Sequence, residues 1–260
     1  MHRCTSSATL QAVEAIARAA GRAILEVYAS DFAVTRKPDA SPLTEADLRA
    51  EALITPALRA LLPGAPVVAE EAHARGECDV AVGQDGAAFW LVDSLDGTQE
   101  FVDRTGEFTV NIALVRSGEP VLGVVYAPAL GRLYAGERGS GAWLEDADGR
   151  REIRCRHAPA EGLHVVTSRV HGDRAAVDSL LQGRPVAQHL AAGSSLKFGL
   201  LASGLVDVYP RYGRTMEWDT AAGQAVLVAA GGAVYDTAGR PLRYGKRGFE
   251  NPHFVARGAS

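Results

Sequence analysis

The chain has 260 residues, of which 47% are hydrophobic and 22% are charged. This length and composition allow a sizeable core without help from disulfides. The formal net charge is −4, which argues against a nucleic-acid-binding surface. The sequence starts without a long apolar segment, and no stretch approaches about 18 uninterrupted apolar residues. We therefore expect a cytoplasmic protein, with peripheral association with the inner membrane as the alternative.

The three cysteines, Cys4, Cys78 and Cys155, are odd in number and far apart. This spacing is typical of reduced thiols rather than of a disulfide framework or a zinc site. The seven histidines are equally scattered, with no HxxxH pair. The sequence therefore gives little support to a soft-metal site.

Two helices are predicted near the N-terminus. Apolar residues recur at helical spacing over Thr9–Ala29, which indicates an amphipathic helix. A second helix is predicted from Thr44 to near Pro63, and Pro56 inside it is expected to bend or split it. Six short β-type runs follow: Pro66–Ala69, Phe89–Val92, Thr109–Val115, Val121–Tyr126, Arg132–Ala135 and Ala142–Leu144. Turn residues separate the last four, which predicts an antiparallel meander.

Strands and helices alternate in the C-terminal part. The predicted elements are a strand in Leu163–Arg169, helices in Asp173–Gly183 and Ser194–Gly204, a strand in Val206–Pro210 and a helix in Trp218–Gly232. We accordingly divide the chain into an N-terminal α+β half, residues 1–157, and a C-terminal α/β half, residues 158–260. The basic run Arg150–His157 is predicted to be a solvated connector between them.

Two carboxylates follow the apolar run Phe89–Val92. Side chains three apart on a strand face opposite sides, but a sharp turn after Asp93 would bring Asp93 and Asp96 together. Gathered carboxylates repel one another unless a cation neutralises them, and hard oxygen ligands suit Mg²⁺ or Mn²⁺. Gly97 and Thr98 then offer free backbone N–H groups to a phosphate. The alternative is an ordinary Asp-Gly turn with an Asx cap.

Further acids stand at the ends of other predicted elements. Glu70 and Glu71 follow a strand, Asp219 precedes a helix, and Asp47 lies three residues after Thr44. Each has an ordinary interpretation, as an acidic loop, an N-cap and a capping box respectively. Together they resemble what a phosphate site with two or three metal ions requires.

Other catalytic motifs are weaker. The chain has no GxSxG elbow, since the segment GSSLKFG has its second glycine in the wrong place. The segment from Gly239 to Lys246 has the wrong spacing for a phosphate-binding P-loop. A hairpin turn explains Gly139-Ser140-Gly141 better than a dinucleotide fingerprint does.

Four motifs resemble those of the lithium-sensitive, magnesium-dependent inositol monophosphatase superfamily. They are AEE at 69–71, DSLDGT at 93–98, WDTAAG at 218–223 and SPLTEAD at 41–47. Their order and spacing agree with the family from about residue 10 to residue 255. The resemblance implies a layered α/β sandwich (α-β-α-β-α) with a mostly antiparallel main sheet and a metal site between the two halves.

The flanking segments are similar to one branch, the 3′(2′),5′-bisphosphate nucleotidases of the bacterial CysQ type. GEFTVNIALV and GSSLKFGLLASGLVDVYPRYG carry this similarity. It implies removal of the 3′-phosphate of 3′-phosphoadenosine 5′-phosphate, a by-product of sulfate assimilation, to give AMP and phosphate. A metal-activated water would attack, without a covalent intermediate. The alternatives are an inositol- or sugar-phosphate monophosphatase and a catalytically silent nucleotide-binding relative.

The resemblance also implies site residues and two or three Mg²⁺ ions. The implied metal ligands are Glu70, Asp93, the carbonyl of Leu95, Asp96 and Asp219. The implied catalytic residues are Asp47, Glu70 and Thr98. The implied substrate-binding residues are Gly97, Thr98, Ser194, Ser195, Lys197 and Asp219. The expected partner is a nucleotide bisphosphate substrate. We expect no nucleic acid and no stable protein partner, and either a monomer or a homodimer.

Three positions depart from the usual family pattern. Ser94 replaces the proline between the paired aspartates, which removes no ligand but is expected to loosen the loop slightly. Gln99 and Arg214 differ nearer the substrate side and bear on nucleotide preference. Lys197, Arg211 and Arg214 are the candidates for holding a second phosphate.

Overall fold

The computed structural model describes residues 7–37, 41–77, 82, 86–169, 181 and 183–259. Most of the helix predicted for Asp173–Gly183 lies outside the described residues, as do Cys4 and Cys78. Cys155 is a free, partly buried thiol. No helix in the described part of the chain is both long and apolar enough to cross a membrane.

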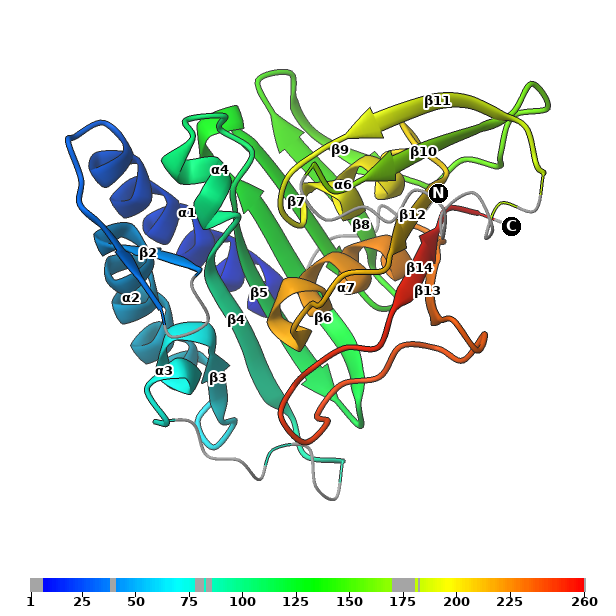
Figure 1. The fold of residues 1–260 in the computed structure, drawn as a ribbon. Helices are drawn as coiled ribbons and strands as arrows, with labels where there is room; N and C mark the ends of the chain where they lie inside the picture. The colour runs from blue at the N-terminus through cyan, green and yellow to red at the C-terminus, as the bar shows by residue number, and fades with distance from the viewer. Residues whose placement is uncertain are drawn as a thin grey trace.

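Both predicted N-terminal helices form. Helix α1 spans Ala8–Tyr28, and the side chain of Ser7 caps it by accepting from the backbone N–H of Leu10 at 3.1 Å. Helix α2 spans Glu45–Leu61 and continues through Pro56, so the proline does not split it. The apolar stripes of both helices pack against one face of the main sheet (Figure 1).

The main sheet has seven strands in the order β3-β4-β5-β6-β7-β8-β9. Their bounds are β3 Val67–Ala69, β4 Phe89–Asp96, β5 Thr109–Arg116, β6 Glu119–Ala127, β7 Arg132–Glu137, β8 Gly141–Asp146 and β9 Gly149–Ile153, with the 3₁₀ turn η2 Pro128–Leu130 between β6 and β7. All neighbours are antiparallel except β3 and β4. The predicted meander is therefore confirmed.

The antiparallel run extends beyond the four predicted strands, to β4 on one side and to β9 on the other. Strand β9 includes the first residues of the basic run that was expected to be a connector. Arg150 on β9 donates to both carboxylate oxygens of Glu14 on α1, at 2.8 and 2.9 Å. The basic side chain thus ties the edge of the sheet to the first helix. Only the end of the basic run, after Ile153, leaves the sheet.

The second sheet has five strands in the order β11-β10-β12-β14-β13. Their bounds are β10 Leu163–Thr167, β11 Val186–Ala191, β12 Val208–Arg211, β13 Ala233–Asp236 and β14 Phe254–Arg257. The strands β10 and β12 match predicted elements, whereas β11, β13 and β14 were missed. Strand β11 carries no apolar alternation because it is exposed along most of its length, so sequence periodicity gives no signal there.

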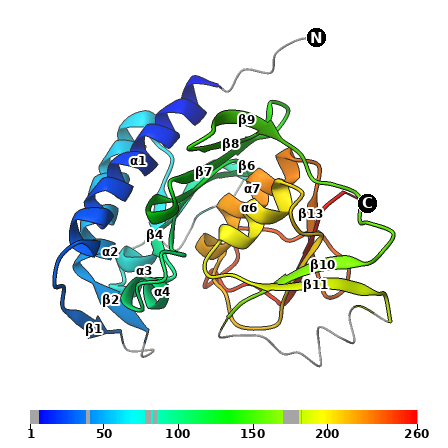
Figure 2. The same cartoon turned by 90° about the horizontal axis from the view of Figure 1, so that it is seen from above.

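Two short helices fill the space between the sheets: α6 Leu196–Ala202 and α7 Ala221–Ala229 (Figure 2). Helix α7 lies close on the main sheet, where two strand glycines make room for it. A Cβ at Gly123 would lie 2.5 Å from the carbonyl oxygen of Ala222, and one at Gly136 would lie 2.5 Å from the Cα of Val226.

The expected layered sandwich with a mostly antiparallel main sheet is confirmed: α1 and α2, the main sheet, α6 and α7, and the second sheet follow one another across the described part of the molecule (Figure 2). The last helical layer expected would fall on residues outside the described ones. The main sheet uses residues 67–153 and the second sheet residues 163–257. One core cluster draws side chains from both parts, however. The division at residues 157 and 158 stays a prediction.

Candidate metal and phosphate site

Asp93 and Asp96 lie on β4 itself, because the strand continues past Val92. Asp93 pairs with Asn111 and Asp96 with Thr109, so three residues on β4 match two on β5. This extra residue is a β-bulge. Residues three apart on a regular strand face opposite sides, and one inserted residue returns them to the same side. The two aspartates were predicted to come together through a sharp turn after Asp93, and in the structure the bulge takes the place of that turn.

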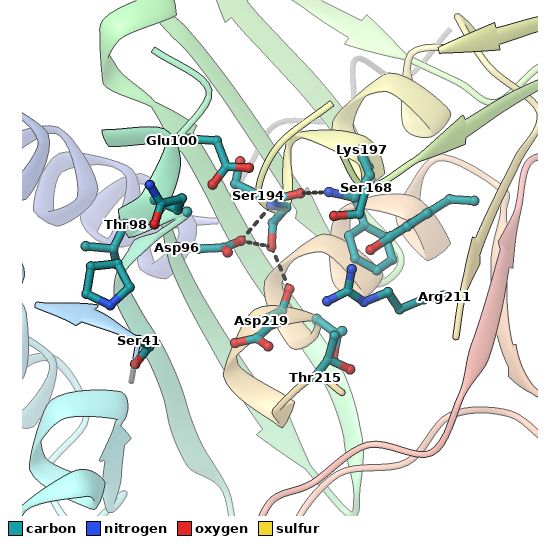
Figure 3. Close-up of a pocket in the computed structure, with 17 residues that line it drawn as sticks. Ser41, Asp96, Thr98, Glu100, Ser168, Ser194, Lys197, Arg211, Thr215 and Asp219 are labelled. Atoms are coloured by element: carbon teal, nitrogen blue, oxygen red, sulfur yellow. Dashed lines mark hydrogen bonds between the residues drawn. The ribbon is translucent and has the colours of Figure 1, made fainter. Parts of the chain in front are cut away.

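Asp96 is held by side chains from both halves of the chain. Its Oδ2 accepts from the Nδ2 of Asn111 at 3.0 Å and from both the backbone N–H and the Oγ of Ser195 at 2.6 Å. The Oγ of Ser195 also lies 2.5 Å from the backbone carbonyl of Asp219. Ser195 thereby links two of the predicted metal ligands, Asp96 and Asp219, which are labelled in Figure 3.

Asp219 does not cap the helix that follows it, contrary to its ordinary interpretation. It ends the short 3₁₀ helix η3, Glu217–Asp219, and its Oδ2 accepts from the backbone N–H of Met216 at 2.8 Å. Helix α7 begins two residues later. The carboxylate is thus fixed by the turn before it and lines the same pocket as Asp96.

Asp47 forms the predicted capping box with Thr44 at the start of α2. Its Oδ2 accepts from the backbone N–H and the hydroxyl of Thr44, at 2.8 and 2.7 Å. Its other oxygen, Oδ1, lies 3.2 Å from the hydroxyl of Thr98. That hydroxyl is also 3.1 Å from the carbonyl oxygen of Leu95. Asp47 therefore caps the start of α2 with one carboxylate oxygen and contacts Thr98 of the candidate site with the other.

Thr98 starts the short helix α4, Thr98–Val102, and Gly97 before it has a φ of +85°. This left-handed conformation favours glycine. A Cβ at Gly97 would also lie 3.3 Å from both the carbonyl of Glu107 and the Cβ of Ser194. Only a residue without a side chain fits here without displacing its neighbours.

Glu70 and Glu71 begin a helix rather than a loop: α3, Glu70–Ala74. The ammonium of Lys37 lies 2.7 Å from a carboxylate oxygen of Glu70 and also bonds to Glu71. Lys37 follows β1, Val34–Arg36, in the small hairpin with β2, Pro42–Thr44. No sequence pattern pointed to Lys37, because it stands outside any periodic run.

Burial and neighbouring carboxylates raise the pKa of Asp93 and of Asp219. Burial is the largest cause for both Asp93 and Asp219, and the charge of Glu70 adds to it in each case. The charge of Asp96 also raises the pKa of both. Burial likewise raises the pKa of Asp47, and raises that of Glu71 to about 7. The folded chain thus gathers carboxylates at one place where their ionised forms are disfavoured.

These groups fit a divalent cation by their chemistry. Their donors are carboxylate and carbonyl oxygens, which Mg²⁺ prefers, and a cation would relieve the mutual repulsion. Among the described residues, no three acidic, histidine or cysteine side chains stand close enough to enclose an ion. The ammonium of Lys37 lies 2.7 Å from a carboxylate oxygen of Glu70. The residues therefore suit the cation in type, with Glu70 paired to a lysine.

A pocket of about 540 Å³ opens beside the carboxylates and is lined by residues from both halves. Asp96, Gly97, Thr98, Ser194, Ser195, Lys197, Arg211 and Asp219 are among its lining residues. Figure 3 shows Arg211 entering from the side opposite Thr98. One wall thus carries carboxylates and a helix start, and the other carries a cation.

Lys197 is buried, and its ammonium donates to the carbonyl oxygens of Ala192 and Ser194, at 3.0 and 2.6 Å. Burial lowers its pKa to about 8. Ser194 has a φ of +45°, an uncommon conformation for a residue with a side chain. The bond from Lys197 therefore braces the loop that presents Ser195 to Asp96.

Sequence reasoning missed Asn111 as well as Lys37. Asn111 is a buried amide inside the otherwise apolar strand β5, and its Nδ2 donates to Asp96 and, at 2.8 Å, to Ser195. A lone amide in an apolar strand was the signal available, because such a group requires a partner when it is buried.

The model of the inositol monophosphatase family matches residues 6–257 of the chain. The chain belongs to the inositol monophosphatase family. Within it, the relative named 3′(2′),5′-bisphosphate nucleotidase CysQ from Escherichia coli (strain K12) is 47% identical over 92% of this chain and 95% of its own length. The protein of the same name from Salmonella typhimurium is 46% identical over 94% of this chain and 98% of its own.

Solved structures of the family show the same fold. CysQ from Bacteroides thetaiotaomicron superposes with a TM-score of 0.83 at 35% identity, covering 96% of this chain and 97% of that one. The extragenic suppressor protein SuhB from Bartonella henselae gives 0.79 at 27% identity, covering 97% and 94%. The family resemblance drawn from the four motifs is confirmed over nearly the whole chain.

Proposed function

We propose that the chain is a magnesium-dependent phosphomonoesterase that removes the 3′-phosphate of 3′-phosphoadenosine 5′-phosphate, giving AMP and phosphate. The observation that carries the proposal is the pocket of about 540 Å³, which is lined by Asp96 and Asp219 from separate segments and by Arg211. The naming of the 47% identical relative supports the same reaction. The proposal places the enzyme in the recycling of the nucleotide released by sulfate assimilation.

Glu70, Asp93, the carbonyl of Leu95, Asp96 and Asp219 would hold the magnesium ions. Bound there, Mg²⁺ would supply charge to stabilise the attacking and leaving oxygens of an in-line displacement. A third ion would lie nearer Asp47.

The chain's own groups would orient the water and the phosphate. The hydroxyl of Thr98 stands 3.2 Å from Asp47, so a water bonded to Thr98 can pass its proton toward a carboxylate. Glu70 is the second carboxylate proposed to orient this water. The backbone N–H groups at Gly97 and Thr98, at the start of α4, are proposed to bond the phosphoryl oxygens.

Three cations are candidates for a second phosphate, and their surroundings differ. The ammonium of Lys197 already bonds two carbonyls, and Arg214 is exposed and paired with Glu250 at 3.3 Å. Arg211 lines the pocket, and its buried Nε has no hydrogen-bond partner among the described residues. The surroundings favour Arg211 for this role over the other two.

An inositol- or sugar-phosphate monophosphatase on the same site is the second candidate. The solved inositol monophosphatase from Anabaena resembles the chain with a TM-score of 0.75 at 26% identity. The two candidates share the metal site and differ in whether a second phosphate and a base improve turnover. The arginine side of the pocket favours the first, because a second phosphate would give the buried Nε of Arg211 the partner that it lacks among the described residues.

Phosphate release with Mg²⁺ separates these candidates. We would compare 3′-phosphoadenosine 5′-phosphate with inositol 1-phosphate at equal concentration, with and without lithium. A large kcat/KM advantage for the nucleotide, suppressed by lithium, is the expected result. A preference for inositol 1-phosphate would keep the metal site and reject the nucleotide assignment. Absence of Mg²⁺-dependent hydrolysis with retained nucleotide binding would instead indicate a catalytically silent relative.

A further inference from the structure

Helix α3, which begins with Glu70, has no side chain of its own that caps its N-terminus. It has five residues, and Ala69 before it offers no side-chain cap. The first backbone N–H groups of a helix have no acceptor within the helix, and a helix this short is unstable alone. The preceding strand β3 has three residues and lies at the edge of the main sheet. The orientation of Glu70 must therefore depend on another element.

Glu51 of α2 supplies the missing acceptor. Its Oε2 accepts from the backbone N–H of Glu71 at 2.9 Å, and its Oε1 accepts from the guanidinium of Arg75, just after α3, at 3.2 Å. Glu51 is 5% exposed. Burial raises its pKa, whereas bonds from the backbone of Glu71 and Ala72 and from Arg75 act in the opposite direction. One carboxylate thus contacts both ends of α3.

We infer that Glu51 is a positioning residue for the divalent-cation site: it caps α3 from the neighbouring helix and so fixes where Glu70 points. Asp47 and Glu51 are four residues apart on α2 and lie on the same helix face. Asp47 is directed toward Thr98, and Glu51 toward α3. Helix α2 therefore sets the positions of two segments of the site. This inference rests on the proposed metal-binding role of Glu70.

A buried carboxylate elsewhere in the chain provides a matched control. Glu14 on α1 is 4% exposed and bonds to Arg150 on β9 and to Arg18. It resembles Glu51 in burial and in its arginine partner, but it bonds to no residue of α3. Removing either carboxylate takes a buried hydrogen-bond acceptor away from its arginine partner, so both changes are expected to lower the unfolding temperature.

The test measures cation binding directly, without substrate, by calorimetric titration of the full-length protein with Mn²⁺. The variants are Glu51→Ala, Glu51→Gln and Glu14→Ala, with unfolding temperatures recorded for each. Loss of a group that orients a metal ligand typically weakens binding about 10- to 100-fold, and this is expected for Glu51→Ala. Glu51→Gln keeps an oxygen that can accept from the N–H of Glu71, so its affinity for Mn²⁺ is expected to fall only several-fold. Glu14→Ala is expected to bind Mn²⁺ like the wild type.

The kinetic pattern is expected to follow binding. The Mg²⁺ concentration for half-maximal activity rises in the Glu51 variants, whereas KM for the phosphate ester at saturating Mg²⁺ stays unchanged. If Glu51→Ala does not fold, the Mn²⁺ affinity of Glu51→Gln tests the inference in its place. Wild-type Mn²⁺ affinity in the Glu51 variants that fold, or an equal loss in Glu14→Ala, overturns the inference.

A Glu70→Gln variant separates this failure from a failure of the proposed metal site. Weaker Mn²⁺ binding in Glu70→Gln alongside unchanged binding in the Glu51 variants rejects only the positioning role. Unchanged binding in Glu70→Gln itself rejects the role of Glu70 as a ligand, and the positioning role with it.

Discussion

Ser94 shows how one residue in the bulge connects two elements. Its hydroxyl donates to the backbone carbonyl of Asp47 at 3.0 Å, and its side chain is buried. This bond joins β4 to the start of α2 directly behind the candidate site. Proline, the usual family residue, has no hydroxyl with which to make it. The bond offsets the loss of rigidity that the sequence analysis expected from serine.

Asp93→Asn is expected to abolish turnover without unfolding the protein. The substitution keeps the shape of the side chain but removes its charge, so an ion between the carboxylates would lose several kcal/mol of stabilisation. The expected loss of kcat is at least about 100-fold. Phosphate release at saturating Mg²⁺ and the circular dichroism spectrum measure the two effects. A near-normal kcat would show that Asp93 is not a ligand.

The buried acids predict an unusual pH dependence of stability in the metal-free protein. Burial raises the pKa of Glu71 from 4.5 to about 7 and raises those of Asp93 and Asp219 as well. The folded state then binds more protons than the unfolded state across this window. Stability contributed by these groups is present below about pH 4.5 and lost as the pH rises through about 7.

Thermal unfolding in a chelator is therefore expected to occur at lower temperature at pH 8 than at pH 5. Mg²⁺ is expected to raise the unfolding temperature more at pH 8 than at pH 5, because a larger share of the carboxylates is ionised and able to bind it at the higher pH. A Glu71→Gln variant should show a smaller loss between these pH values. An unfolding temperature that rises from pH 5 to pH 8 without metal would contradict the assignment.

At the scale of secondary structure, the close contact of α7 with the main sheet decides where Asp219 lies. Asp219 ends η3, which leads directly into α7. The helix reaches the sheet because β6 and β7 carry Gly123 and Gly136 at the contact. A helix held further out would carry Asp219 away from Asp96, so packing between layers and the geometry of the site are coupled.

Gly123→Ala is expected to destabilise the fold by about 1–3 kcal/mol, because the added methyl would meet the backbone carbonyl of Ala222. The backbone carbonyl cannot move away by a change of rotamer, as the end of a flexible side chain can. We also expect weaker Mg²⁺ activation, since α7 must shift. Chemical denaturation measures the first effect and Mg²⁺ titration of activity the second. A wild-type free energy of unfolding together with wild-type Mg²⁺ activation would mean that α7 and the sheet can accommodate the added methyl group.

At the scale of the whole molecule, the candidate site belongs to neither half alone. Asp93 and Asp96 come from the first half, whereas Ser195 and Asp219 come from the second. One core cluster likewise combines Val125 of the main sheet with Val226 of α7 and Phe254 of the second sheet. The two predicted halves therefore share a hydrophobic interior.

A fragment of residues 1–157 is expected not to fold stably. It would expose the face of the main sheet that α7 covers, and exposed apolar sheet surface promotes aggregation. Expression of the fragment, followed by size exclusion and thermal unfolding, tests this expectation. Co-expression with residues 158–260 is the control, and it should restore soluble material. A cooperative unfolding transition from the first fragment alone would instead support two independent domains.

Local patterns in the sequence were sufficient for the elements whose signals are local. The stripe of α1, the capping box of Asp47 and Thr44, and the turn residues of the meander each depend on neighbours within a few positions. The four acidic motifs likewise predicted hard-ligand chemistry from residue type alone. Exposed strands such as β11 were missed, because burial on one face is what produces a readable alternation.

Only the tertiary structure decided what depends on distant segments. The bulge of β4 requires its register with β5, the bond of Ser195 to Asp96 spans 99 positions, and the bond of Glu51 to Glu71 spans 20. Sequence spacing does not encode such contacts, because they form only when the layers pack. The sequence by itself determined the kinds of groups at this site, and the packing of two sheets around α6 and α7 decided which of them meet.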